Sequence, residues 1–129
     1  MTRRIATVTL VVTDYDEAIR WYVGKLGFSV AEDIGLGAGK RWVTLDPGEG
    51  GARLLLGKAD GPRQASHVGD QTGGRVFLFL ETDDFARDHA AMLAKGVSFL
   101  EAPRHEPYGT VAVFSDLYGN RWDLIEPRR

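Results

Sequence analysis

The segment Pro103-Arg104-His105-Glu106-Pro107-Tyr108-Gly109 gathers a guanidinium, an imidazole, a carboxylate and a phenol within a few residues. Its two prolines and its glycine predict a loop of restricted shape. In such a loop Arg104 would bind a carboxylate and His105 would transfer a proton near neutral pH. The alternative is that Arg104 pairs with Glu106 or another acid and the loop only closes the fold, and we favour this second interpretation slightly.

The elements that position this loop begin with a predicted strand at residues 5–12, where β-branched side chains dominate. Asp14, with Glu17 three residues later, predicts the start of a helix, and Gly27 predicts its end. Three further strands are predicted at residues 28–34, 40–45 and 52–56, separated by glycine-rich turns. The first part of the chain is therefore ordered strand, helix and three strands.

The second part of the chain repeats this order after a predicted linker at residues 58–74, which is rich in Gly, Pro, Gln, Ser and Asp. A strand is predicted at 76–81, a helix from Asp84 to Gly96, and strands at 97–100, 110–115 and 121–126. Like residues recur at a constant offset, because Gly27 and Gly96 are 69 apart, as are Glu32 and Glu101. We predict one domain, residues 1–129, built of two βαβββ modules at 1–57 and 75–129.

Three motifs in this order resemble those of the glyoxalase/bleomycin resistance protein/dioxygenase proteins, also called the vicinal oxygen chelate superfamily. Residues 14–28 resemble the signature D-x6-FY-x3-LGF, residues 107–109 resemble a P-W-G turn, and residues 116–124 resemble the closing motif D-P-x-G-N-x-x-E-L. The resemblance covers nearly the whole chain. It implies an α+β fold in which two tandem βαβββ modules form a curved sheet, an incomplete barrel, around a cleft. It leaves the activity open, because the superfamily includes lyases, isomerases, dioxygenases and proteins that sequester antibiotics.

The resemblance also implies where a metal would bind. Many enzymes of the superfamily hold one divalent metal, bound by His, Gln or Glu from the first and last strands of each module, where it acts as a Lewis acid. The corresponding positions in this chain are Thr7, Leu55, Phe77 and Asp123. Only Asp123 is a usual ligand for a divalent cation, and a stable site needs three or four. We therefore expect no metal and no other cofactor, the alternative being a divalent metal whose ligands lie elsewhere.

The histidines do not complete such a metal site. None of the three shows ligand spacing with another His or Glu on one element; they are His67, His89 and His105. We expect them to be solvated or hydrogen-bonded at the surface.

Alternation along the strands predicts the lining of the cleft. If Thr7, Phe77 and Asp123 face it, then Thr9, Phe79, Arg121 and Ile125 share that face and Trp122 belongs to the core. Phe77 and Phe79 either form an aromatic floor for a planar ligand or fill a collapsed cavity, and Trp42 either offers a stacking surface or covers the core. The candidate ligand-binding residues are Thr7, Thr9, Trp42, Phe77, Phe79, Arg104, Tyr108 and Arg121, and the candidate catalytic residues are His105 and Asp123.

Composition restricts the partners of this protein. A net charge of −2 and the lack of a basic face argue against nucleic acid and anionic membranes. The N-terminal apolar stretch ends at Asp14 and is too short to span a membrane, and the chain has no cysteine, which fits a reducing compartment. We expect a cytoplasmic protein with a small-molecule ligand. By analogy with the superfamily, we also expect a homodimer.

Three functions fit these observations. The first, which we favour, is metal-independent binding of an aromatic or carboxylated small molecule. The second is a metal-dependent glyoxalase-type lyase or isomerase, or an extradiol-type dioxygenase. The third is an enzyme without metal that uses His105 or Asp123 as an acid or base.

Overall fold

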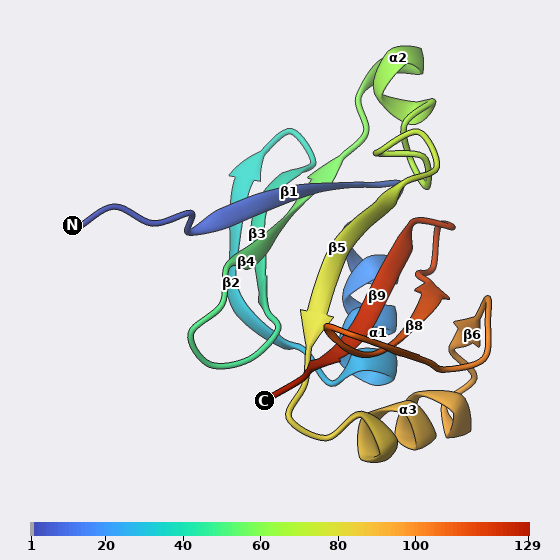
Figure 1. Cartoon of the computed structure of the whole chain (residues 1–129). Helices are drawn as coiled ribbons and strands as arrows, with labels where there is room; N and C mark the ends of the chain where they lie inside the picture. The colour runs from blue at the N-terminus through green and yellow to red at the C-terminus, as the bar shows by residue number, and fades with distance from the viewer. Residues whose placement is uncertain (1) are drawn as a thin grey trace. The chain divides into compact units, whose positions relative to one another are not determined.

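The protein is described here by a computed structural model that covers residues 2–129, and its chain divides into two compact units between Val68 and Gly69 (Figure 1). The first unit contains β1 (Thr7–Val12), α1 (Tyr15–Leu26), β2 (Ser29–Gly37), β3 (Lys40–Asp46), β4 (Arg53–Lys58) and α2 (Gly61–Ala65). The second contains β5 (Val76–Glu81), α3 (Phe85–Ala94), β6 (Ser98–Phe99), β7 (Arg104–Glu106), β8 (Gly109–Ser115) and β9 (Arg121–Pro127). The predicted α+β class is confirmed.

The two units have the same sheet topology. Their strand orders are β1-β4-β3-β2 and β5-β9-β8-β6, with β7 added beside β8. In each unit the first strand pairs in parallel with the last one, so that Thr9 lies opposite Leu55 and Phe79 lies opposite Asp123. Thr9 and Phe79 each stand five residues before the aspartate that caps the following helix. Leu55 and Asp123 therefore occupy equivalent positions in the internal repeat.

The helices α1 and α3 begin and end close to where the sequence predicts. The side chain of Asp14 accepts a hydrogen bond from the Glu17 N–H at 2.8 Å, which satisfies one of the free donors of the first turn of α1. Gly27 follows α1 with φ of 74°, a conformation that favours glycine. Asp84 caps α3 in the same way, accepting from the Arg87 N–H at 3.0 Å.

One face of each sheet is covered by a helix. In the first unit α1 packs on β2, β3 and β4 over fully or almost fully buried side chains, which are Leu10, Val12, Tyr22, Val43, Leu45, Leu54 and Leu56. In the second unit α3 packs against β9, and an aromatic row runs below it from Phe99 through Phe114 to Trp122. Trp122 is 2% exposed, so its predicted place in the core is confirmed. The opposite face of each sheet is called its far face below.

Two segments differ from the sequence prediction. The stretch predicted as a linker contains α2, a short helix with no buried residue; a helix without an apolar face leaves no periodicity to detect. The predicted loop around His105 contains β7, which pairs antiparallel with β8 as a hairpin. A strand of three residues between prolines lacks the length that strand patterns require. No described helix has the length and apolar character to cross a membrane.

The closing motif is a turn held by one buried carboxylate. Asp116 Oδ1 accepts hydrogen bonds from the backbone N–H groups of Tyr118, Gly119 and Asn120 at 2.9–3.0 Å. The side chain of Asn120 in turn accepts from the Gln71 N–H at 3.2 Å. The motif therefore joins β8 to β9 and fastens the start of the second unit to this turn.

Gly69 provides a test of this packing. It has φ of +78°, and a Cβ there would overlap the carbonyl group of Tyr118, whereas Gly73 has a similar φ of +68° with open space around it. We expect Gly69→Ala to lower the free energy of unfolding by about 2 kcal/mol more than Gly73→Ala, because both variants carry the backbone strain and only the first adds overlap. Urea denaturation measures both values, and equal losses would contradict the packing.

Candidate functional site

A glutamate organises the far face of the first sheet. Glu32, on β2, accepts hydrogen bonds from Trp42 Nε1 and from Thr44 Oγ1, both at 3.1 Å, and lies 3.7 Å from the guanidinium of Arg53. Hydrogen bonds from Trp42 and then Thr44, followed by the charge of Arg53, hold the pKa of Glu32 below its ordinary value. Thr44 pairs with Leu55 across the sheet, which places this cluster opposite the face that α1 covers.

Trp42 is oriented rather than buried. Its ring nitrogen is bound to Glu32, and the residue is 39% exposed. Of the two interpretations left open by the sequence, the exposed indole favours a stacking surface over a cover for the core. Its contact with a ligand stays a prediction.

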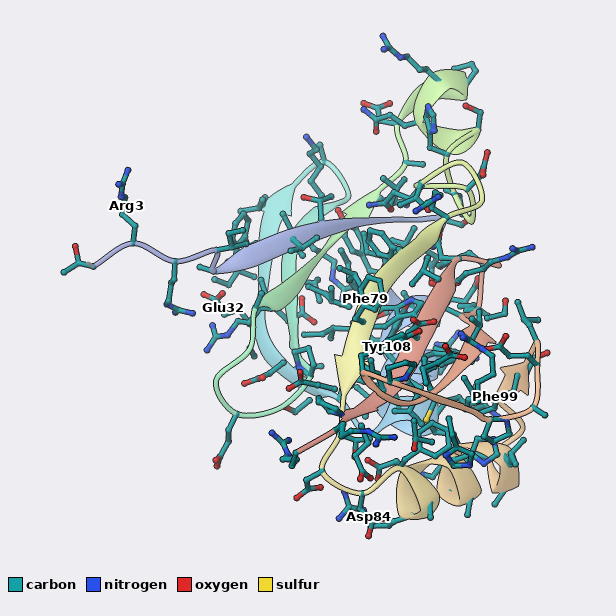
Figure 2. The ribbon with its side chains drawn as sticks, viewed as in Figure 1. Arg3, Glu32, Phe79, Asp84, Phe99 and Tyr108 are labelled. Atoms are coloured by element: carbon teal, nitrogen blue, oxygen red, sulfur yellow. The ribbon has the colours of Figure 1, made fainter. Side chains whose placement is uncertain are left out.

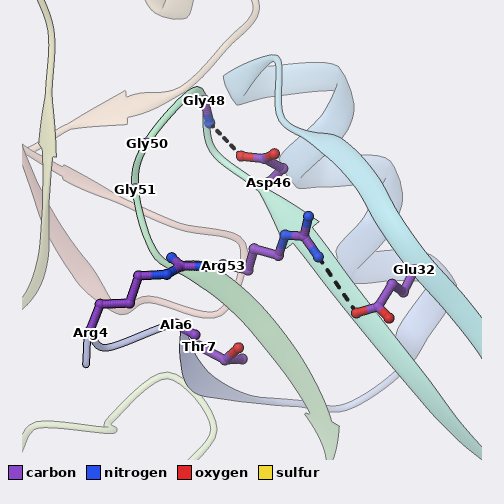
Figure 3. Close-up of a pocket in the computed structure, with 9 residues that line it drawn as sticks. All are labelled: Arg4, Ala6, Thr7, Glu32, Asp46, Gly48, Gly50, Gly51 and Arg53. Atoms are coloured by element: carbon purple, nitrogen blue, oxygen red, sulfur yellow. Dashed lines mark hydrogen bonds and ion pairs between the residues drawn. The ribbon is translucent and has the colours of Figure 1, made fainter. Parts of the chain in front are cut away.

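A pocket of about 530 Å³ opens at the end of this sheet (Figure 3). Its lining consists of Arg4, Ala6, Thr7, Glu32, Asp46, Gly48, Gly50, Gly51 and Arg53. The volume suits a small ligand. Figure 3 shows two internal contacts, from Arg53 to Glu32 and from the Gly48 N–H to Asp46 Oδ1 at 3.0 Å. Thr7, one of the predicted ligand-binding residues, belongs to this lining, and the exposed Thr9 lies farther along β1.

An arginine and a glutamate form the corresponding cluster in the second unit. Arg104 Nε donates to Glu101 Oε2 at 2.9 Å, and its Nη1 lies 3.3 Å from Glu106 Oε1. Glu101 Oε2 also accepts from the Val113 N–H at 3.1 Å. These contacts, with a further bond to Tyr108, hold the pKa of Arg104 above its ordinary value. The guanidinium is thus paired with the chain's own carboxylates, as the second interpretation of this segment expects.

Asp123 lies beside this cluster in a different environment. It pairs with Val113 on one side and with Phe79 on the other, and it is 7% exposed. Its Oδ1 is buried without a hydrogen-bond partner among the described residues. Burial raises the pKa of the Asp123 carboxyl, the charge of Arg104 partly lowers it, and the charge of Glu101 raises it further. Burial therefore makes ionisation of this carboxyl less favourable than that of an exposed aspartate.

Two exposed aromatic rings belong to the same unit. Phe79, the strand neighbour of Asp123, is 64% exposed, and Tyr108 follows β7 (Figure 2). Arg121 is also exposed, two residues before Asp123 on β9, so alternation places it on the same far face.

Phe77 does not share the far face with Phe79. The pairing of β5 with β9 shifts between Val76 and Leu78, and the ring of Phe77 meets Trp122 edge-on with centroids 6.1 Å apart. A bulge adds one residue to a strand and breaks the alternation on which the predicted aromatic floor depended. Phe77 therefore extends the aromatic row on the helix-covered face and leaves Phe79 as the exposed ring.

His105 and Asp123 are not brought together. On β7, Arg104 lies opposite Val111 and His105 lies opposite Thr110, so successive residues alternate and His105 points to the other face from Arg104. Its Nδ1 lies 3.2 Å from Thr110 Oγ1. His89, expected to be solvated or hydrogen-bonded at the surface, is instead half-buried, with its ring near those of Phe85 and Phe99 at centroid distances of 5.2 and 4.5 Å. The acid–base role of His105 stays a prediction.

Sequence reasoning missed the residues that hold these clusters together. They are Glu32, Thr44, Arg53 and Glu101. One signal for them was present, because Glu32 and Glu101 share the repeat offset of 69, as do their partners Thr44 and Val113. A polar residue that recurs at the same point of two modules indicates a common structural task. For Glu32 and Glu101 this task is to accept hydrogen bonds from the neighbouring strand.

The donor set does not fit a metal centre of the kind the resemblance implies. The first unit offers Thr7 and Leu55 at the two positions, and the second offers Phe77, which is turned to the core, and Asp123. One carboxylate and one hydroxyl do not make a stable site for a divalent cation. Within residues 2–129, no group of three or more His, Cys, Asp or Glu side chains is placed to hold a metal ion.

Comparison with known proteins gives a uniform result. The model of the Glyoxalase/Bleomycin resistance protein/Dioxygenase superfamily matches residues 4–124. An uncharacterized protein of Shewanella frigidimarina (strain NCIMB 400) is 52% identical over 128 residues, which cover 98% of this chain and 95% of that one. The crystal structure of UcmS2 superposes with a TM-score of 0.83 at 30% identity, covering 97% of this chain and 98% of the other. TnmS3, an antibiotic-binding protein from Streptomyces sp. CB03234, superposes with a TM-score of 0.79 at 29% identity, covering 99% of both chains.

The environment of Asp123 predicts a pH dependence of stability. Its folded pKa lies above that of the unfolded chain, so its stabilising contribution is present below the unfolded pKa of about 3.9 and is lost as pH rises through the folded value. Asp123→Asn cannot ionise, and we expect the variant to gain stability relative to the wild-type protein as pH rises from 4 to 7. Urea denaturation across this range measures the difference.

The matched control for this experiment is Asp60→Asn, which removes one exposed carboxylate that makes no capping bond to α2. The difference in free energy of unfolding between Asp123→Asn and the wild-type protein should grow in favour of the variant as pH rises. A constant difference, or one that changes in favour of the wild-type protein, would contradict the assigned environment.

Proposed function

Because this chain belongs to the glyoxalase/bleomycin resistance protein/dioxygenase superfamily, we propose that it binds a small aromatic molecule on the far face of a sheet without a bound metal. The observation that carries this proposal is the donor set at the superfamily's metal positions. Three of the four side chains, those of Thr7, Leu55 and Phe77, offer no charged or imidazole ligand. These positions offer too few ligands to hold the divalent metal that would act as a Lewis acid.

An aromatic ligand is favoured over a carboxylated one by the state of the charged groups. Arg104 is paired with Glu101 and Glu106, and Arg53 lies beside Glu32. A carboxylate ligand bound at Arg104 or Arg53 would have to displace one of these pairs, which costs the ligand part of its binding free energy. Exposed rings, by contrast, are offered by Trp42 in the first unit and Phe79 in the second. Aromatic faces stack on planar ligands and gain from removal of apolar surface from water.

The antibiotic-binding neighbour supports binding rather than turnover as the task. TnmS3 is described as an antibiotic-binding protein, and its fold covers nearly all of this chain. We propose the same class of activity here, sequestration of an aromatic natural product. In this activity the exposed ring of one unit, Trp42 in the first or Phe79 in the second, supplies contact area, and the glutamate cluster of that same unit fixes the shape of the surface around it.

Binding that needs no metal makes a direct prediction. In a thermal-shift screen against aromatic antibiotics and aromatic metabolites, we expect at least one compound to raise the melting temperature by the same amount with and without EDTA. A ligand at about 100 times its Kd adds about 2.7 kcal/mol to the free energy of unfolding, which is a shift of several degrees. Elemental analysis of protein purified without chelators provides the second measurement.

Two outcomes would contradict the proposal. One tightly held divalent ion per chain, with ligand shifts lost in EDTA and restored by that ion, would favour the metal-dependent lyase, isomerase or dioxygenase. Turnover of a bound compound that is lost in Asp123→Asn or in His105→Ala would favour the enzyme without metal.

We also propose that the protein is a homodimer that pairs through β2. This strand is an edge of the first sheet, and it exposes three apolar side chains, Val30, Ile34 and Leu36. An exposed apolar edge strand gains stability when a second strand covers it.

The dimer proposal is tested by sedimentation equilibrium. We expect the wild-type protein to sediment with twice the chain mass and a variant with both Ile34→Lys and Leu36→Lys to sediment as a monomer, because charges on an edge strand oppose pairing. Val23→Lys, which places a charge on an exposed position of α1, is the control and is expected to remain dimeric. A wild-type monomer at all concentrations would overturn the proposal.

A further inference from the structure

The internal repeat shows which residues the fold itself requires. Thr9 opposite Leu55 in the first sheet occupies the same place as Phe79 opposite Asp123 in the second. The first pair demonstrates that this place in the sheet is built without an aromatic ring and without an acid. The second pair is therefore a departure that the topology does not explain.

Both members of the second pair are unfavourable for stability. Asp123 is 7% exposed with an unpartnered Oδ1, and a buried polar atom without a hydrogen bond costs about 1–3 kcal/mol. Phe79 leaves 64% of its surface exposed, so it gains little from burial. Asp123 lowers the stability of the free protein, and the neighbouring Phe79 adds little to it. Two such residues on adjacent strands indicate a ligand-binding site.

The neighbours of Asp123 limit the chemistry of that ligand. Arg104, whose charge acts on Asp123, is engaged with Glu101 and Glu106. Glu101 accepts a hydrogen bond from Val113, the strand neighbour of Asp123. A negative group approaching Asp123 would meet the charge of Glu101, while the guanidinium of Arg104 is already engaged with two carboxylates. A neutral group with a hydroxyl hydrogen bond matches the unpartnered Oδ1 instead.

We propose that Phe79 and Asp123 form a subsite for a neutral hydroxylated aromatic ring, which stacks on Phe79 and exchanges a hydrogen bond between its hydroxyl group and Asp123 Oδ1. This inference rests on the proposed function and narrows the ligand class from aromatic compounds to phenols. Because Oδ1 is buried in the free protein, binding of the hydroxyl requires a local movement around Asp123, whose strand neighbour Phe79 is exposed.

Three naphthalenes that differ in one substituent test the subsite. They are 2-naphthol, 2-methylnaphthalene and 2-naphthoate, measured by isothermal titration calorimetry. We expect the wild-type protein to bind 2-naphthol about tenfold more tightly than 2-methylnaphthalene, the usual gain from one hydrogen bond to a buried group, and 2-naphthoate least tightly.

Variants at the two positions separate the contributions. Asp123→Asn keeps a polar partner and is expected to retain the preference for 2-naphthol. Asp123→Leu copies the first repeat, where Leu55 stands, and is expected to bind 2-naphthol and 2-methylnaphthalene equally. We expect the melting temperature of Asp123→Leu to equal or exceed that of the wild-type protein, which would show that the variant folds. Phe79→Thr, which copies Thr9, is expected to weaken all three probes about equally.

Each contrary result has a distinct meaning. Equal binding of 2-naphthol and 2-methylnaphthalene by the wild-type protein would overturn the role of Asp123 while leaving aromatic binding intact. Tightest binding of 2-naphthoate would overturn the neutral class and assign recognition to an arginine. Failure of all three to bind would overturn the subsite, and the antibiotic screen would still decide the proposed function independently.

Discussion

The structure depends on one constraint, the parallel pairing of the first and last strands in each unit. Parallel neighbours cannot be joined by a tight turn, so the chain must leave the sheet between them, and α1 and α3 lie on these excursions. Each helix returns to one face of its sheet and covers the apolar side chains there. The far face is thereby released from helix packing, and this is where Glu32 in one unit and Asp123 in the other are found.

The same frame carries different chemistry in its two copies. In both units a glutamate on the strand or segment after the helix accepts a hydrogen bond from the next strand, Thr44 donating to Glu32 and Val113 to Glu101. At the pair of positions on the parallel strands the copies diverge, with a leucine in the first unit and Asp123 in the second. The hydrogen bonds that recur in both units hold the sheets together, and the positions that differ between the units are available for ligand binding.

The sequence predicted the fold nearly completely, because its signals are local and repeated. Capping aspartates, helix-ending glycines and strand patterns each act within a few residues, and Asp14, Gly27 and Asp84 do what they predict. The site was predicted less well, because its geometry depends on pairing. The bulge at Phe77 turns one ring to the core, and the hairpin of β7 turns His105 away from Asp123. No local pattern reports a bulge or a short edge strand, since both are defined by the partner strand.

The central claim is that the ligand binds on the far face of the second sheet, beside Asp123. It is tested most directly by nuclear magnetic resonance of the uniformly labelled protein titrated with 2-naphthol in the presence of EDTA. We expect the largest shift changes at Phe79, Val113 and Asp123. Met92, on the buried side of α3, and Phe99, on β6, are expected to be unchanged. Changes confined to the helix-covered face, or changes that appear only when a divalent metal replaces EDTA, would contradict the claim.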